Sequence, residues 1–322
     1  MTRGTGGSRQ APRPTGPGGG LGSATLLQVI AGIDLGGTQV RVAVARSDGR
    51  IVASNRNRMA ELRTPRRTVE WLGEQVARLS NGDVVRSVGI GAPGPTDPAR
   101  GLLVNPPNLP GWRNVPLAAM VQEAIGCPTH LENDANLAGL GEFHHGGGRG
   151  TRTMVYITWS TGVGAGLILD GRLFSGAHGT AGEVGHMILD PKGPLDSCGQ
   201  RGCVEVYCGG GSLARQTGGT AQALFDEAAG GNGEAAERVR AAATQMGYAL
   251  VNVANLFDPE VIVMGGGVAR SWAQVAPIME GVLRSSPFIK PRRRPRLRRA
   301  RLGDRAGQVG AVEWAREHLA EC

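Results

Sequence analysis

The positions of apolar residues along the chain predict an alternation of β-strands and α-helices. Apolar runs bounded by glycine and polar turns indicate strands, and short connections between such runs indicate hairpins. Apolar residues that recur every three or four positions indicate helices. In the first part of the chain we predict strands over residues 26–37, 40–47, 51–57 and 84–94, and helices over residues 68–80 and 116–126.

A second series of the same kind begins near residue 153. Its first segment, residues 153–171, is again a strand that enters a Gly/Thr turn and continues as a second strand. A helical region from Thr220 to Phe257, a strand over 260–267 and a closing helix over 306–320 follow. The repeated order predicts a fold of the α/β class in which two related halves face each other.

The composition is typical of a globular protein in a reducing compartment. The chain of 322 residues is 40% hydrophobic and 19% charged. No apolar run approaches the roughly 20 residues needed to span a bilayer. The five cysteines form an odd set, and the N-terminus lacks the apolar core of a secretory signal. We therefore expect a cytoplasmic protein without a membrane segment, in which clustered cysteines bind metal more often than they form disulfides.

Two segments have a biased composition. Residues 1–24 are rich in Gly, Pro, Ser, Thr and Arg without apolar periodicity, which predicts a disordered N-terminal tail. The formal net charge of +8 arises from residues 290–301, which contain eight positive residues and no negative one. Such a cluster can attract nucleic acid or another polyanion, but residues 294–302 also alternate like an edge strand with solvated arginines. We favour the edge strand, so the charge does not mark the whole molecule as a nucleic-acid-binding protein.

Two Gly/Thr turns, one in each half, are candidate phosphate-binding sites. Backbone N–H groups and a hydroxyl in such a turn suit a phosphate, and a carboxylate beside it can hold Mg²⁺ through water. A hairpin with a tight bend is the alternative for either turn alone, but the pair defines a cleft between the halves. The residues concerned are Asp34, Gly36, Gly37 and Thr38 in the first half and Thr161 and Gly162 in the second.

Polar residues in two further segments are candidates for substrate binding and catalysis. Asp134, between a predicted strand and a predicted helix, can act as a general base that accepts the proton of an attacking hydroxyl. Asn133 can bind a neighbouring oxygen, and either residue can instead cap the helix. Asn108 lies in a Pro-rich loop, which presents it to a polar ligand or forms only a turn. Spacing leaves both alternatives open.

A third candidate is a metal site between residues 186 and 203. His186, Cys198 and Cys203 are spaced like ligands of a structural zinc. The position where a third cysteine would fit is Asp196, whose carboxylate is also an accepted zinc ligand.

Nine segments of the chain occur in the order seen in the ROK family of bacterial sugar kinases and sugar-responsive repressors. They are DLGGT, GIGAPGP, NPPNLPGW, LENDAN, STGVGAG, GTAGEVGH, CGQRGCVE, FDPEVIVMGGGV and AGQVGAVEWA. The resemblance covers about residues 30–318. It implies the actin-like, ribonuclease-H-like fold of sugar kinases, with ATP and a hexose meeting in a cleft between two α/β domains, in a homodimer or homotetramer.

The resemblance also implies how the chain divides. Residues 28–130 would form a small α/β domain, completed by the C-terminal helix at about 306–320. Residues 131–305 would form a large α/β domain that contains the zinc-type loop over 186–203.

The family's site residues carry over position by position, and Asp134 matches its catalytic base. The positions that match sugar contacts are Asn108, Asn133, Asp134, Glu183, His186 and Glu205. Those that match contacts to ATP and its Mg²⁺ are Asp34, Gly36, Gly37, Thr38, Thr161, Gly162, Gly265, Gly266 and Gly267. Two positions depart from the pattern: Ser160 stands where the family often has glycine, and Gln39 where it often has lysine. Neither change removes a group that phosphoryl transfer requires.

The same resemblance bears on the zinc hypothesis. The family's ligands are the histidine of the GH motif and three cysteines, the first of which corresponds to Asp196 here. We expect a structural Zn²⁺ held by His186, Asp196, Cys198 and Cys203, which would fix His186 and the adjacent glutamates as a rigid sugar-binding wall. The alternatives are a metal-free loop and a site that recruits Cys208 instead.

The expected activity is that of an ATP-dependent hexokinase, first of all a glucokinase. A kinase of an N-acetylated hexosamine, mannose or fructose is the alternative, and polyphosphate remains open as a donor. A sugar-responsive repressor of this family would carry a DNA-binding domain before the core. Only about 30 Gly/Pro-rich residues precede the first motif, so we expect no binding to DNA.

Overall fold

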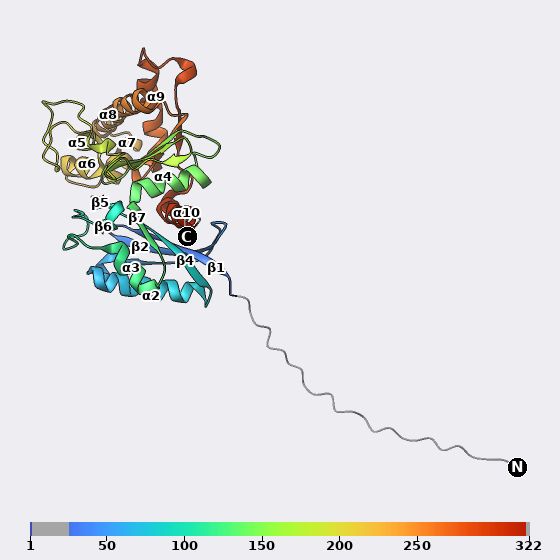
Figure 1. The fold of residues 1–322 in the computed structure, drawn as a ribbon. Coiled ribbons are helices and arrows are strands. Elements are labelled where there is room, and N and C mark those ends of the chain that lie inside the picture. Colours follow the sequence, from blue (N-terminus) through green and yellow to red (C-terminus); the bar gives the residue numbers. More distant parts are fainter. Residues whose placement is uncertain (2–25, 320–322) are drawn as a thin grey trace.

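The computed structural model describes Met1 and residues 26–319, which form two lobes with helices α4 (Asp134–His145) and α10 (Ala306–Leu319) between them (Figure 1). The tail expected over residues 1–24 lies, apart from Met1, outside the described residues. Within the described part of the chain, no helix is long and apolar enough to cross a membrane.

The lower lobe in Figure 1 is built on a five-stranded sheet of order β3-β2-β1-β4-β7. Its strands are β1 (Gln28–Leu35), β2 (Gln39–Arg46), β3 (Ile51–Arg58), β4 (Val84–Ala92) and β7 (Thr129–Asn133). The first three form the two predicted hairpins, whereas β1, β4 and β7 run parallel. Because parallel strands end at the same edge of a sheet, Asp34 and Asn133 come to one edge, where ligands of such sheets bind.

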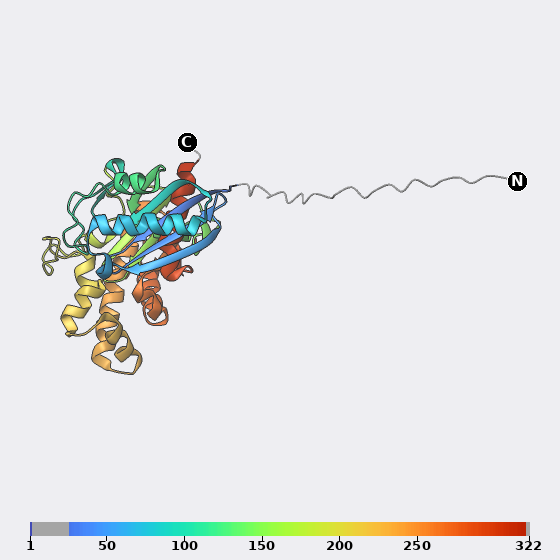
Figure 2. The same cartoon turned by 90° about the horizontal axis from the view of Figure 1, so that it is seen from below.

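Helices cover both faces of this sheet. Helices α2 (Pro65–Ser80) and α3 (Leu117–Ile125) pack on one face, and α10 packs on the other (Figure 2). Helix α2 begins at Pro65, three residues before the predicted start at residue 68, because the Thr64 hydroxyl accepts a hydrogen bond from Arg67 N–H and proline follows at the first helical position. The remaining elements are helix α1 (Met59–Leu62), strands β5 (Thr96–Asp97) and β6 (Leu102–Leu103), and a 3₁₀ turn over Pro98–Arg100.

The upper lobe contains a second five-stranded sheet, of order β10-β9-β8-β11-β12. Its strands are β8 (Met154–Trp159), β9 (Val163–Leu169), β10 (Arg172–Leu173), β11 (Val261–Gly265) and β12 (Arg296–Arg299). The edge position of β12 confirms the edge strand predicted in the basic segment. Strands β8 and β11 are parallel, so the turns at 160–162 and 265–267 emerge at one edge of this sheet.

Helices of the upper lobe cover the sheet face opposite α4. They are α5 (Val204–Cys208), α6 (Gly210–Thr217), α7 (Ala221–Ala229), α8 (Gly233–Phe257) and α9 (Trp272–Ser285), and four 3₁₀ turns lie at Val184–His186, Gly267–Ser271, Pro291–Arg293 and Gly303–Arg305. The helical region expected from Thr220 to Phe257 is thus two helices. The polar Gly-Gly-Asn turn at 230–232 separates them, since it lacks apolar side chains that would pack on the core.

Helices α4 and α10 approach each other closely where they cross. A Cβ atom on Gly310 would overlap the carbonyl oxygen of Leu137, and one on Gly141 would lie 2.6 Å from the carbonyl oxygen of Ala306. Only glycine fits at both positions. Because α10 also packs on the first sheet and α4 on the second, this contact fixes the N-terminus of α4 between the two lobes.

The expected boundary between the domains falls inside a strand of the first sheet. Strand β7 pairs with β4 from Thr129 through Asn133, so a division at residue 130 would cut a strand of the first sheet. We propose a division between Asn133 and Asp134, with α10 assigned to the first domain.

Candidate active site

The turn after β1 is shaped by two close approaches. Gly36 N–H donates a hydrogen bond to the carbonyl oxygen of Gln39 at 2.8 Å, which closes the turn. A Cβ atom on Gly37 would lie 2.8 Å from the Cβ atom of Asn108. Glycine at 37 therefore allows the Pro-rich loop that carries Asn108 to close over the turn, and Gly37, Thr38 and Asn108 line the same cavity of about 950 Å³.

At the junction of β7 and α4, Asn133 and Asp134 have different roles, which the sequence left open between helix capping and contact with a substrate. Asn133 caps the helix, because its Oδ1 accepts hydrogen bonds from the N–H groups of Ala135 at 2.9 Å and Asn136 at 3.3 Å. Asp134 is the first helical residue, and it lines the cavity of about 950 Å³. Burial, helped by the negative charges of Asp34 and Glu183, raises the pKa of Asp134 to about 6.

Two cavities meet at Asp134. The first, of about 950 Å³, and a second, of about 500 Å³, are both lined by Asp134, Thr158 and Ser160. A third cavity, of about 380 Å³, adjoins them and shares Ser160, and its walls include the apolar side chains of Phe225 and Val268. A carboxyl group on the boundary between two spaces can contact groups bound in both.

The structure brings most of the predicted site residues to these cavities. The first cavity is lined by Gly37, Thr38, Asn108, Asn133, Asp134, Thr161, Gly162, Glu183, His186 and Glu205. The second is lined by Asp34, Gly265, Gly266 and Gly267. Gly36 lines none of the three cavities and serves the turn, and Asp196 and Cys203 are buried behind the cavity wall.

Glu205 is tied to the second Gly/Thr turn. Its Oε2 accepts a hydrogen bond from Val163 N–H at 2.7 Å, and a Cβ atom on residue 162 would collide with the same carboxylate. Glycine at 162 thus lets helix α5 place Glu205 directly against the start of β9. The turn that carries Thr161 and the candidate sugar contact Glu205 form one unit.

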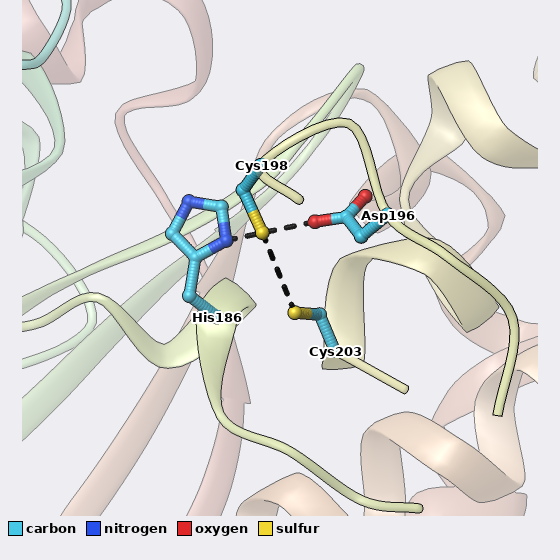
Figure 3. A group of neighbouring side chains, drawn as sticks. All are labelled: His186, Asp196, Cys198 and Cys203. Carbon is cyan, nitrogen blue, oxygen red and sulfur yellow. Dashed lines mark hydrogen bonds and ion pairs between the residues drawn. The ribbon is translucent and has the colours of Figure 1, made fainter. Parts of the chain in front are cut away.

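His186, Asp196, Cys198 and Cys203 form a compact cluster at the loop that precedes α5 (Figure 3). One ligand atom from each residue lies within 4.8 Å of the others. The two sulfur atoms are 3.6 Å apart, and His186 Nδ1 is 3.7 Å from Asp196 Oδ2. The imidazole Nε2 is directed to the other side, 4.0 Å from Glu183 Oε2.

Two polar residues in the site were not assigned a role by the sequence. Glu132 is buried, and its carboxylate accepts hydrogen bonds from Asn133 N–H, the Asn136 side chain and the Ser175 hydroxyl, all between 2.7 and 2.9 Å. It holds the turn that carries Asp134, and its place inside the LENDAN segment was the available signal. The second is Arg41, which lines the second cavity and pairs with Asp34.

Comparison with known protein families shows that residues 30–318 match the ROK family. The chain belongs to the ROK family. Among its relatives, a glucokinase of Streptomyces coelicolor is 33% identical over 319 residues, covering 89% of this chain and 97% of the relative. An N-acetylmannosamine kinase of Citrobacter koseri is 34% identical over 254 residues, covering 76% and 86% respectively.

A solved structure of the ROK family has the same architecture. It is the glucokinase of Streptomyces griseus in complex with glucose and AMPPNP, which is 32% identical with a TM-score of 0.75 and covers 90% of this chain and 99% of its own. The fold is therefore the actin-like, ribonuclease-H-like fold of ROK sugar kinases, as the sequence predicted.

Proposed function

We propose that this protein is an ATP-dependent hexokinase that converts glucose to glucose 6-phosphate. The observation that carries the proposal is the place of Asp134, whose carboxyl lies on the boundary between two cavities and has a pKa raised to about 6. A base in that position can take the proton of a hydroxyl in one cavity while the oxygen attacks a phosphate in the other.

The first cavity suits an uncharged sugar. A hexose offers many hydroxyl groups and no charge, so its recognition requires carboxylates and amides that accept and donate paired hydrogen bonds. The lining of the larger cavity has this character. We assign as sugar-binding residues Asn108, Asn133, Asp134, Glu183, His186 and Glu205.

The second cavity suits the phosphates of ATP. The glycines after β11 line it, and Asp34 places a carboxylate at its wall. Oxygen ligands of this kind are those that Mg²⁺ prefers, and Mg²⁺ bound with ATP would neutralise phosphate charge. We assign as nucleotide-binding residues Asp34, Gly265, Gly266 and Gly267 in this cavity, and Gly37, Thr38, Thr161 and Gly162 of the two Gly/Thr turns, which line the first cavity next to it. Gly36 belongs to this set through the turn that it closes. The apolar third cavity beside Thr161 and Gly267 is suited to the adenosine.

The transfer step follows from these positions. Asp134 accepts the proton of the sugar hydroxyl while that oxygen forms a bond to the γ-phosphorus of ATP. The bond between this phosphorus and the β,γ-bridging oxygen breaks, and ADP leaves with the electron pair. Phosphoryl transfer depends mainly on positioning and charge stabilisation, which the two lobes provide by holding acceptor and donor on either side of one carboxylate.

We also propose that His186, Asp196, Cys198 and Cys203 hold a structural Zn²⁺. Tetrahedral zinc with bonds of about 2.0 to 2.3 Å places its ligand atoms roughly 3.3 to 3.8 Å apart. The sulfur–sulfur separation of 3.6 Å agrees with that spacing, and the Nδ1–Oδ2 separation of 3.7 Å is slightly longer than an N/O pair requires. His186 Nδ1 and both oxygens of Asp196 are buried without a hydrogen-bond partner among the described residues, so a cation would satisfy them.

Zinc at this site would affect sugar binding by fixing the orientation of His186. With Nδ1 bound to the metal, the ring of His186 is held with Nε2 toward Glu183 and the first cavity. The cellular setting that fits the free cysteines and the substrates is the cytoplasm. We expect a homodimer or homotetramer there, which sedimentation of the purified protein would test.

An assay of ADP release over a sugar panel tests the proposed function. Glucose should give the highest kcat/KM with Mg²⁺-ATP, among glucose, mannose, fructose, N-acetylglucosamine and N-acetylmannosamine. The likeness to an N-acetylmannosamine kinase makes the last sugar the second candidate. Sugar phosphate formed from polyphosphate instead of ATP would reassign the donor. Absence of transfer to every sugar from either donor would contradict the kinase assignment.

A further inference from the structure

Arg41 is the residue of β2 that faces the carboxylate of Asp34. The two positions are partners in the antiparallel pair of β1 and β2. Arg41 Nη1 lies 3.0 Å from Asp34 Oδ2, and Arg41 Nη2 donates a hydrogen bond to Gln39 Oε1 at 3.1 Å. Two acceptors, one on each terminal nitrogen, thus fix the direction of the guanidinium group in the wall of the second cavity.

The ion pair is shielded from solvent, unlike the other described ion pair at this cavity. The side chains of Arg41 and Asp34 are 23% and 13% exposed. Arg270 also lines the cavity, but its side chain is 64% exposed and lies 3.5 Å from the exposed carboxylate of Asp304. Arg299, the remaining arginine of the lining, is exposed as well. Charges that are shielded from water interact more strongly, so Arg41 is the arginine of this lining whose charge acts most on a bound anion.

A fixed cation in the second cavity would favour the binding of a phosphate group. Asp34 and Asp134 both contribute carboxyl groups to its wall, and their charges would repel a polyphosphate. A guanidinium group carries more N–H donors than the two contacts of Arg41 use, and its planar shape matches phosphate oxygens. The same side chain can therefore orient Asp34 and donate to an anion beside it.

We infer that Arg41 is a donor-phosphate-binding residue, which contacts the phosphates of ATP directly from the wall of the second cavity. This inference rests on the proposed kinase function. It assigns a positive charge to the donor site from β2, a strand that contributes no other charged residue to the three cavities. Gln39 holds the guanidinium from the same face of the strand.

The first test is the effect of Arg41→Gln on the two substrates separately. Charge-assisted hydrogen bonds are about twice as strong as neutral ones, so KM for ATP should rise by roughly tenfold or more, with KM for glucose within about twofold. Arg41→Lys should raise KM for ATP less than Arg41→Gln does, because lysine keeps the positive charge. The matched control is Arg46→Gln, an exposed arginine at the other end of β2, opposite Val29, which should behave as wild type.

A second test separates a direct contact from an effect through Asp34. Binding of ATP is measured by calorimetry in EDTA and in an Asp34→Asn background, where residue 34 neither holds a metal nor repels the phosphates, and adenosine serves as the control ligand. Direct contact requires that Arg41→Gln weakens metal-free ATP severalfold and leaves adenosine unchanged. Weakening only in the presence of Mg²⁺ would overturn the inference in favour of a role limited to orienting Asp34.

A third test places the charge at a neighbouring position. Gln39→Lys in the Arg41→Gln background puts an ammonium group where it can reach the same space, since positions 39 and 41 share one face of β2. Recovery of metal-free ATP binding would support the inference, and an unchanged KM for ATP in Arg41→Gln would overturn it. Failure of the proposed function is distinguishable, because wild-type protein would then release no ADP with any sugar.

Discussion

The imidazole Nδ1 of His186 lies 3.7 Å from the carboxylate oxygen Oδ2 of Asp196, and neither atom has a hydrogen-bond partner among the described residues. Both atoms are buried. Unsatisfied buried polar atoms are costly, because they lose their water contacts without replacement. Both lie beside a pair of cysteine sulfurs, and the four groups together could hold a cation (Figure 3).

Purified protein should contain about one zinc per chain, and Asp196→Ala should lose much of it, because the substitution removes one of four ligands. Asp196→Cys should retain zinc at least as firmly, since thiolate is a soft ligand that zinc favours. Elemental analysis after dialysis measures both. Cys208→Ala is the control, because this buried thiol donates to the carbonyl oxygen of Val204 and should not affect the metal.

Loss of zinc should mainly weaken the binding of the sugar. Because His186 reaches both the cluster and the first cavity, Asp196→Ala should raise KM for glucose more than KM for ATP. Steady-state kinetics with each substrate varied would measure the difference. Wild-type protein that is free of zinc and has an unaltered KM for glucose would refute the structural role of the metal.

Asp134→Asn should retain the fold and sugar binding but lower kcat by ~10² or more, because an amide cannot accept the proton of the attacking hydroxyl. The size of the side chain hardly changes, and Asn133 still caps the helix. Kinetics and glucose titration of the same preparation measure the two effects. A folded variant with near-normal kcat would remove Asp134 from its role as base.

The pH dependence should show an acidic limb near the pKa of Asp134. Burial and two neighbouring carboxylates raise that pKa to about 6, so the free enzyme binds the proton more tightly than an exposed aspartate does. Only the ionised base accepts a proton, so kcat/KM for glucose should fall as the pH drops through about 6. The residual activity of Asp134→Asn should lack this limb, and a wild-type profile that stays flat well below pH 6 would contradict the assignment.

Neutralising Arg292, Arg293 and Arg294 should leave kcat/KM for ATP within a few-fold. Strand β12 runs parallel to β11, and Arg296 pairs with Val261 whereas Arg299 pairs with Met264 beside the cleft. The three arginines precede Arg296 and so lie at the end of the sheet away from the site. A tenfold fall that disappears at high salt would instead reveal an electrostatic role in donor binding.

Local pattern was sufficient for most of the strands and for the turns that carry Asp34 and Thr161. The hairpins after residue 28, the edge strand in the basic segment and the motifs around Asp134 each depend on a few neighbouring residues, whose periodicity and turn chemistry the sequence records. Local pattern was not sufficient where a contact between distant segments decided the outcome. The expected division at residue 130 lies inside β7, which pairs with β4, a partner that no local window contains.

The sequence by itself determined the order of strands and helices, the family and the residue types available for chemistry. Only the tertiary structure decided how those residues combine. It gave Asn133 the role of helix cap and brought Asp134 to the cavity wall. It also placed Arg41 against Asp34 and set the register in which Arg296, not Arg299, pairs at the start of β11. The physical reason is that burial, charge pairing and shared cavities depend on distances between segments far apart in the chain, which periodicity does not encode.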